Sequence, residues 1–212
     1  MDIQHLQDRI YWGLNRVADK IGQAADAYRP AGPRRPLDPS NRYLHLKAAF
    51  GRSDGNFSKA VGYGEPLWRG YFDASYTQVG DYLVSGSDVW FIAAQQSMLP
   101  VECVKANQLV SITRPPTPDT GSTYGSATSA PDETILCGWP ASLLGIGSRD
   151  RPPAQLPGDT TLSTWTAYLP VTPGITIHVA DFVTTEEGGK GIVAAVESTD
   201  LGWRLDIRRV ST

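Results

Sequence analysis

The sequence predicts a mainly β protein, built from two tandem small antiparallel β-barrel or sandwich modules behind an N-terminal α-helical arm. Three observations lead to this prediction: one apolar stripe at helical spacing near the start, short apolar runs bounded by turn residues in the rest, and a weak internal repeat of those runs. The chain holds 21 Gly and 16 Pro in 212 residues, which favours many turns over long helices.

The N-terminal stretch carries its apolar side chains at the spacing of one helix face. Asp2 can cap the start of this helix and Gly22 can end it. Two interpretations of the stripe remain open, since it can pack on the protein's own β-body or dock on a neighbouring subunit. The stripe consists of Ile3, Leu6, Ile10, Leu14, Val17 and Ile21.

A proline-rich stretch follows the helix. Residues 28–42 contain no run that would form a core, and such a segment is extended and semi-rigid. We therefore expect a helical arm over residues 1–27, held away from the body by a tether over residues 28–42.

The stretch 80–114 predicts three short strands, at 82–84, 89–94 and 109–113, because these runs are rich in β-branched and aromatic residues. Residues 85–88 form a turn between the first two. Together with the preceding apolar runs they predict a first β-module over residues 43–114.

A degraded copy of the same pattern returns after a segment of Pro, Ser, Thr and Gly at 115–133, which we interpret as the linker between modules. The copy predicts a second module over residues 134–212. In chain order, 134–139 matches 43–50, 164–169 matches 67–72, 179–183 matches 79–83, 191–198 matches 90–97, and 204–208 matches 109–114.

Two loops are candidates for contacts with other subunits. The Gly-rich segment 51–66 is long for a simple connection, and the segment 115–132 is exposed by composition. Their tyrosines, Tyr63 and Tyr124, join the helix stripe as candidate subunit contacts.

The charge distribution does not indicate a nucleic-acid partner. The net charge is −3, with a balance of +3 over residues 1–47 and −6 over the remainder, and an excess of +3 is too small to predict DNA contact. The first residues resemble no secretory signal and no stretch is long and apolar enough to span a bilayer. We expect a protein made in a cytoplasm, without membrane contact.

The sequence carries no recognised catalytic, cofactor-binding or metal-binding motif. We therefore expect a protein that is not an enzyme and uses no cofactor or metal. Asp81 and Asp181 recur at matching positions, and an Asp that opens a strand after a turn can accept backbone N–H bonds, so we predict a structural role for both. Cys103 and Cys137 lie in apolar contexts and are expected to be reduced, buried thiols.

The order of these motifs, with GDYLV, a hairpin, WFIAAQQ, a long connection and LVSITRP, resembles the small β-barrel modules of tailed-bacteriophage head–tail joining and tail proteins. YRPAG, PLDPSNR, GWPASLL and DLGWRLDIRR also resemble proteins encoded in structural-gene clusters of phages and prophages. The resemblance implies a virion structural protein of the neck, tail or baseplate. Its implied partners are other phage structural proteins and further copies of itself, in a ring.

A second interpretation belongs to another class of protein. The chain has 6 Trp and 9 Tyr, and aromatic side chains that lie exposed could bind glycans or a receptor. Most of the tryptophans sit inside apolar strand patterns, which is more typical of core residues.

Overall fold

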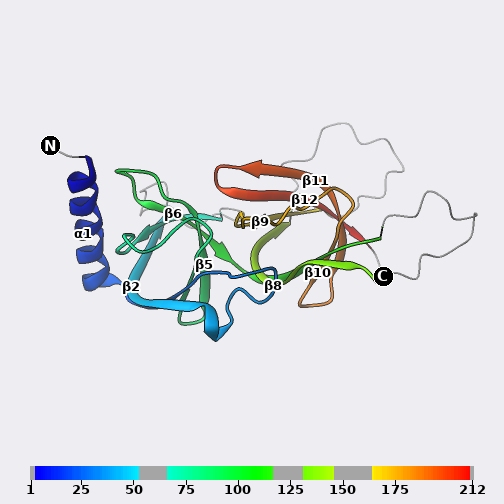
Figure 1. Cartoon of the computed structure of the whole chain (residues 1–212), viewed down its shortest axis with the longest axis horizontal. Helices are drawn as coiled ribbons and strands as arrows, with labels where there is room; N and C mark the ends of the chain where they lie inside the picture. Colours follow the sequence, from blue (N-terminus) through cyan, green and yellow to red (C-terminus); the bar gives the residue numbers. More distant parts are fainter. Residues whose placement is uncertain (1–2, 53–65, 117–130, 146–163, 211–212) are drawn as a thin grey trace, which may run out of the picture.

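The computed structural model describes residues 3–52, 66–116, 131–145 and 164–210. These residues form an N-terminal helix and two antiparallel β-barrels of six strands, each closed on itself. The helix lies at one end, the first barrel beside it, and the second barrel at the other end with the C-terminus (Figure 1). The predicted fold class is confirmed.

The first barrel has the strand order β1-β2-β3-β6-β5-β4, and the pairing of β1 with both β2 and β4 closes it. The helix α1 (Ile3–Ile21) precedes it directly, and a short 3₁₀ helix, η1 (Pro39–Asn41), lies before β2. The strands are β1 (Gln23–Tyr28), β2 (Arg42–Arg52), β3 (Leu67–Tyr71), β4 (Tyr82–Ser85), β5 (Asp88–Ala94) and β6 (Val101–Ala106).

The second barrel repeats the same order with its own six strands, closed by the pairing of β7 with β10. They are β7 (Gln108–Arg114), β8 (Glu133–Gly145), β9 (Thr164–Leu169), β10 (Phe182–Thr185), β11 (Lys190–Thr199) and β12 (Gly202–Val210). A hairpin turn over residues 186–189 joins β10 to β11.

Two of the predicted module boundaries are wrong, because the first strand of each barrel was assigned to the segment that precedes the barrel. Residues 23–28 belong to no arm or tether, because they form the first strand of the first barrel. Likewise, β7 does not end the first module but begins the second barrel. The segment after Arg114 therefore joins two strands of one barrel and is not a linker between modules, since Arg114 pairs with Glu133.

The internal repeat is real, with one correspondence corrected. The stretch 204–208 lies in β12, which matches β6 and not 109–114. The stretch 109–114 instead matches the region around β1. Both segments read Gln, five residues, Arg, Pro, at 23–30 and 108–115.

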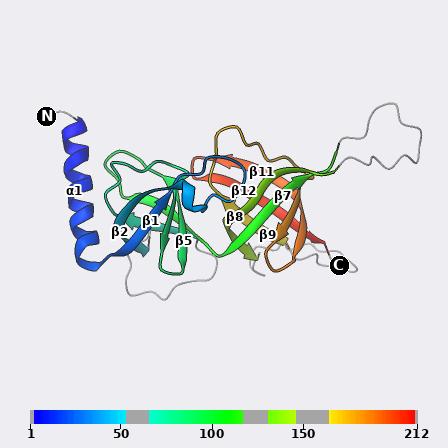
Figure 2. The same ribbon diagram turned by 60° about the horizontal axis from the view of Figure 1, so that its bottom comes forward.

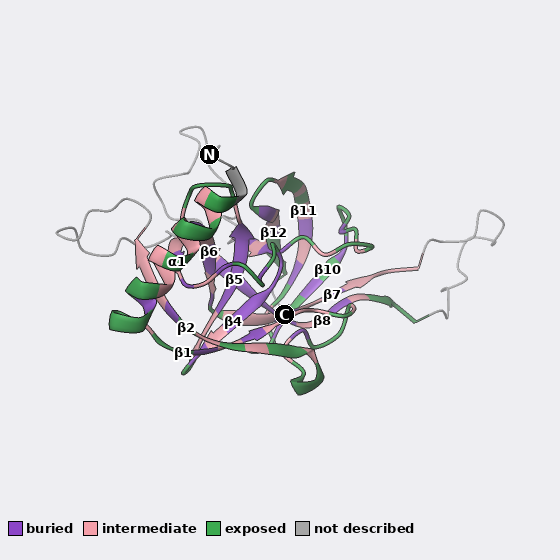
Figure 3. Ribbon diagram, turned by 60° about the vertical axis from the view of Figure 1, so that its left-hand side comes forward, coloured by how far each residue is buried: buried purple, intermediate pink, exposed green. Residues whose placement is uncertain are grey.

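Two apolar clusters fill the barrels, and the larger of them crosses from one barrel to the other. Leu83, Trp90 and Ile92 belong to the cluster inside the first barrel. Tyr82 and Phe91, which alternate with them along the same strands, belong to the cluster of the second barrel. Buried residues follow one another along β4 and β5 (Figure 3), so these two strands are packed on the inside and on the outside of the first barrel.

The helix packs against the first barrel and does not stand away from it (Figure 2). The amide of Gly22 donates to the carbonyl of Ala18 at 2.7 Å where the helix ends. A Cβ at Gly22 would lie 2.9 Å from the carbonyl oxygen of Ala48, so glycine allows the close approach of helix end and β2. Among the described residues, no helix is long and apolar enough to cross a membrane.

Candidate functional site

A single residue, Asn107, connects the two barrels, and its hydrogen bonds fix the second barrel against the first. Its amide donates to Ala141 O at 2.9 Å. Its side chain donates to Leu143 O at 2.8 Å and accepts from Leu143 N at 2.7 Å. Asn107 thereby satisfies backbone groups of β8 where that strand turns from β7 to β9.

A buried tyrosine completes the junction. The hydroxyl of Tyr82 donates to Pro140 O at 2.8 Å, and its ring meets that of Trp139 edge-on at 6.0 Å. Both side chains are fully buried. Burial raises the pKa of the Tyr82 hydroxyl well above its ordinary value.

The proline-rich segment after β1 crosses this junction. Cys137 N donates to Pro33 O, and Arg35 N donates to Cys137 O, both at 2.9 Å. The indole of Trp139 also donates to Pro33 O, at 2.8 Å. The predicted free tether is therefore part of the interface between the barrels.

One arginine–aspartate pair recurs at the same place in each barrel. In the first, Arg29 follows β1 and donates from Nε to Asp81 Oδ1 at 2.9 Å and from Nη2 to Asp81 Oδ2 at 2.8 Å. Asp81 also accepts from Gln78 N at 2.9 Å, and Arg29 donates to Tyr76 O at 3.2 Å. The hydrogen bonds to Asp81 are the main cause that raises the pKa of Arg29.

The second barrel repeats this arrangement. Arg114 donates from Nε to Asp181 Oδ1 at 2.8 Å and from Nη2 to Asp181 Oδ2 at 3.0 Å. Asp181 accepts from His178 N at 2.8 Å, and Arg114 donates to Thr176 O at 2.9 Å. Both carboxylates thus fix a turn and join it to the first strand of the barrel, which gives the recurrent aspartates the structural role that their positions predict.

The two pairs differ in one partner. Tyr43 donates its hydroxyl to Asp81 Oδ2 at 2.6 Å, and the guanidinium of Arg29 lies 4.5 Å from the centre of its ring. Burial, followed by the hydrogen bond to Asp81, raises the pKa of Tyr43 above its ordinary range. Asp81 is therefore held by more groups than Asp181.

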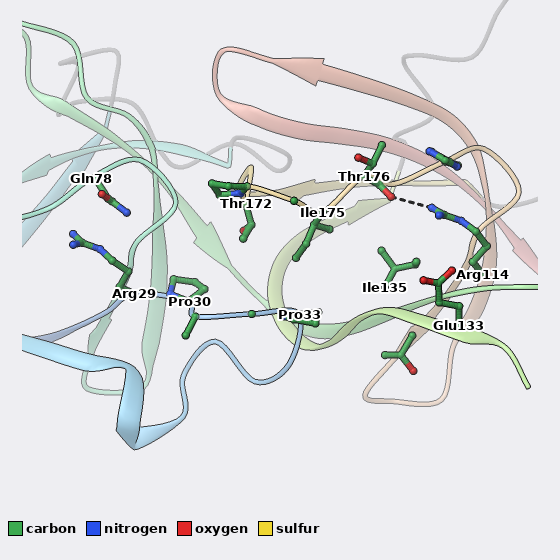
Figure 4. A pocket seen from close by; sticks show the side chains of 16 residues that line it. Arg29, Pro30, Pro33, Gln78, Arg114, Glu133, Ile135, Thr172, Ile175 and Thr176 are labelled. Carbon is green, nitrogen blue, oxygen red and sulfur yellow. Dashed lines mark hydrogen bonds between the residues drawn. The ribbon is translucent and has the colours of Figure 1, made fainter.

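Both arginines line one cleft of 780 Å³ between the barrels. Figure 4 shows Arg29 and Arg114 at opposite ends, with Ile135 and Ile175 between them and Pro30 and Pro33 along one wall. Since each arginine is already paired with a buried aspartate, the two guanidinium groups add little net positive charge to the cleft.

The predicted subunit contacts divide into three groups. Leu6, Ile10 and Leu14 are half-buried, while Val17 and Ile21 are exposed, Ile21 at 72%. The side chain of Ile3, together with Tyr63 and Tyr124, lies outside the residues that the structure describes. The stripe thus faces partly away from the barrel.

The side chains that attach the helix were missed from sequence. Gln7 Oε1 accepts from Met98 N at 2.7 Å, and Tyr11 OH accepts from Gln95 Nε2 at 3.1 Å. Ala18 is fully buried. Gln7, Tyr11 and Ala18 lie four and seven residues apart, a spacing that could have revealed this second face.

Both cysteines are free, as expected. Cys103 is buried, and burial raises its thiol pKa, whereas the prediction of a buried thiol is wrong for Cys137, which is half-buried. His45 lies 2.8 Å from Asp26, and this hydrogen bond lowers the Asp26 pKa. Within the described ranges, no three His, Cys, Asp or Glu side chains are grouped so that they could hold a metal.

Five of the six tryptophans are buried or half-buried. Trp90 and Trp139 are buried, whereas Trp12 on the helix is 62% exposed, with the guanidinium of Arg16 4.8 Å from its ring centre. Exposed aromatic surface in the described part of the chain is therefore concentrated outside the cleft.

The chain was compared with known proteins at three levels. No protein-family model matches it, and no curated protein and no solved structure is significantly similar to it.

Proposed function

We propose that this chain is a non-enzymatic structural protein of a tailed-phage particle, which joins neighbouring proteins of the neck, tail or baseplate through its surfaces. The proposal combines the motif resemblance described above with a rigid double barrel. The two recurrent aspartates support a non-enzymatic role, because Asp81 and Asp181 each already accept hydrogen bonds from an arginine and from a turn amide.

The observation that carries the proposal is the position of the helix stripe. The helix holds its barrel with Gln7, Tyr11 and Ala18. Its apolar residues Val17 and Ile21 stay 39% and 72% exposed. An apolar helix flank that is left uncovered by the barrel of the same chain is typical of a surface that docks on another protein.

The experiment measures how much of a variant chain, with charged residues in the helix stripe, is incorporated into particles. In Val17→Asp/Ile21→Asp, both substituted side chains are exposed, so the barrels should fold as before. We expect occupancy in purified particles to fall about tenfold or more, since two apolar contacts are lost. The matched control is Lys20→Asp, an exposed position between them on the same helix, which should enter particles normally.

Full occupancy of Val17→Asp/Ile21→Asp would exclude the helix flank as the contact. A wild-type chain that is absent from every particle, but whose tryptophan fluorescence changes on addition of glycans, would exclude the structural role and favour the glycan-binding alternative.

A further inference from the structure

The first barrel contacts the second through one continuous apolar row. Tyr82 pairs with Phe91, Phe91 with Val104, and Val104 with Leu67 across four neighbouring strands. Tyr82, Phe91 and Val104 are buried in the cluster of the second barrel, and Leu67 packs against it. We call this row, on the outside of the first barrel, its donor face.

The same row exists on the second barrel, where the described structure leaves it partly open. Phe182 pairs with Ile192, Ile192 with Arg208, and Arg208 with Thr164. Phe182 is 37% exposed. The donor face of the second barrel is therefore apolar in one half, Phe182 and Ile192, and polar in the other.

A groove runs beside this open donor face. It has a volume of 640 Å³ and is lined by Val179, Ile192, Ala194, Arg208 and Val210, among others. Val179 and Val210 are 59% and 42% exposed. The apolar area at this face thus extends beyond Phe182 and Ile192.

The end of the second barrel that receives the first lies between two features. One is β8, where Asn107 donates to Ala141 O. The other is the turn from β11 to β12, where Leu201 shares a groove with Leu67 and Val104 of the first barrel. We call this region the receiving end.

On the first barrel, α1 covers the equivalent receiving end. Gly22 precedes β1 as Asn107 precedes β7, and it approaches Ala48 on β2, the residue that pairs with Gln23 as Ala141 pairs with Gln108. At the other side, Gln7 accepts from Met98 N in the turn from β5 to β6. The helix therefore occupies on the first barrel the place that the first barrel occupies on the second.

The helix covers this end incompletely. Two of its contacts are hydrogen bonds of Gln7 and Tyr11, and its ion pair between Asp19 and Lys47 is exposed on both sides. Leu99 in the receiving turn stays 53% exposed. Such a contact is weaker than the junction between the barrels, where Tyr82, Phe91 and Val104 are buried.

We propose that the donor face of the second barrel binds the receiving end of the first barrel in another copy of this chain, once α1 has left that end. The contact would continue the barrel-to-barrel interface already present inside each chain. It joins two different surfaces, so it generates a ring if the rotation closes and an open filament if it does not. The inference rests on the proposed function, in which α1 docks on a neighbour.

The test uses the full chain with the helix released. Tyr11→Glu/Ala18→Glu places charges on the helix face that packs against the first barrel. We expect the monomer to become a concentration-dependent series of larger species in sedimentation velocity. Adding Phe182→Glu should return the variant to a monomer, whereas adding Tyr76→Glu, at an exposed aromatic residue outside the donor face, should not.

Mixing separates a head-to-tail contact from other association. One chain carries the helix substitutions with Phe182→Glu, and the other carries them with Leu99→Glu, so each keeps one intact surface. Each alone should be a monomer, and the mixture should form a dimer and stop there. Gln7→Ala/Tyr11→Phe, which removes the helix hydrogen bonds without adding charge, provides the same test if the first pair fails to fold.

A folded, helix-released variant that stays monomeric at all concentrations, or one that associates regardless of Phe182→Glu, would overturn the inference. Particle incorporation of the wild type that depends on Val17 and Ile21 would in that case leave the proposed function standing. Loss of that dependence alongside normal head-to-tail association would instead remove the proposed function and keep the interface.

Discussion

Tyr82 and Pro140 join the two barrels by a hydrogen bond that is sealed from water on both sides. The tyrosine belongs to β4 of the first barrel and the proline to β8 of the second, and the hydroxyl lies 2.8 Å from the carbonyl oxygen. Since both barrels share the surrounding apolar cluster, we regard the described structure as one cooperative folding unit and not as two independent domains joined by a linker.

Replacing this tyrosine should weaken the whole unit. Tyr82→Phe removes the donor and leaves a buried carbonyl with one bond fewer, so we expect a loss of about 1–2 kcal/mol in the free energy of unfolding. Chemical denaturation should show one transition at lower denaturant concentration. The exposed Tyr76→Phe serves as control, and an unchanged midpoint for Tyr82→Phe would contradict the role of the bond.

The repeated Arg–Asp pairs should differ in strength. Asp81→Asn should cost about 2 kcal/mol, because the buried Asp81 loses its charged hydrogen bonds to Arg29, whose side chain is 41% exposed. Asp181→Asn should cost about 1 kcal/mol less, since Asp181 lacks the hydrogen bond that Tyr43 gives to Asp81. Thermal denaturation of both variants ranks their losses of stability, with Asp200→Asn, at an exposed position, as the control. The reverse order would show that Tyr43 adds nothing.

The turn before each pair offers a substitution that should stabilise. Gly80 has φ +94°, and Ala180 stands at the matching position with φ +73°. A left-handed conformation suits glycine better than alanine, so Ala180→Gly should stabilise by about 0.5–1 kcal/mol, and Gly80→Ala should destabilise by at least as much. A Cβ at Gly80 would also approach Val171 O to 3.1 Å. Melting temperatures that move in the same direction for both would disprove the equivalence of the turns.

Glu102 should make stability depend on pH. Burial raises its pKa above the ordinary value, and Arg69 offsets this only in part. An acid with a raised pKa in the folded state binds more protons when folded, so stability is lost as the pH rises from the unfolded pKa through the folded one. Glu102→Gln should remove this loss and stabilise the protein near pH 7 by roughly 0.5–1 kcal/mol.

Unfolding measured from pH 4 to 7 would check this, with the exposed Glu197→Gln as the control. Parallel curves for the wild type and Glu102→Gln would mean that Glu102 does not carry the dependence.

Most strands were predictable from the sequence because they are rich in β-branched and aromatic residues. β1 was not, since Gln23–Tyr28 contains three alanines, a glutamine and an aspartate, which favour a strand only weakly. Its place in the barrel comes from pairing with β2 and β4. The Gln-to-Arg-Pro spacing shared with residues 108–115 was the one local signal for it.

Local sequence patterns could not predict the junction between the two barrels. A proline-rich segment without periodicity suggests a tether, yet Pro33 and Arg35 bond to Cys137 far along the chain. The helix stripe was predicted correctly as a helix face, but the docked side is set by Gln7 and Tyr11, whose polar groups meet partners on the first barrel. The helical spacing of Gln7, Tyr11 and Ala18 was the one indication of that side, whereas the hydrogen bonds of the proline-rich segment leave no trace in hydrophobic spacing.

The single-residue connection at Asn107 also bears on how the protein is made. Each barrel is built from consecutive strands, so the first can close while the ribosome is still synthesising the second, as N-terminal units generally do. During that interval Tyr82, Phe91 and Val104 have nothing to cover them. The nascent chain therefore exposes an apolar surface until β8 and the turn from β11 to β12 have emerged, and the speed of translation through residues 108–202 sets how long that surface stays open to aggregation and to chaperones.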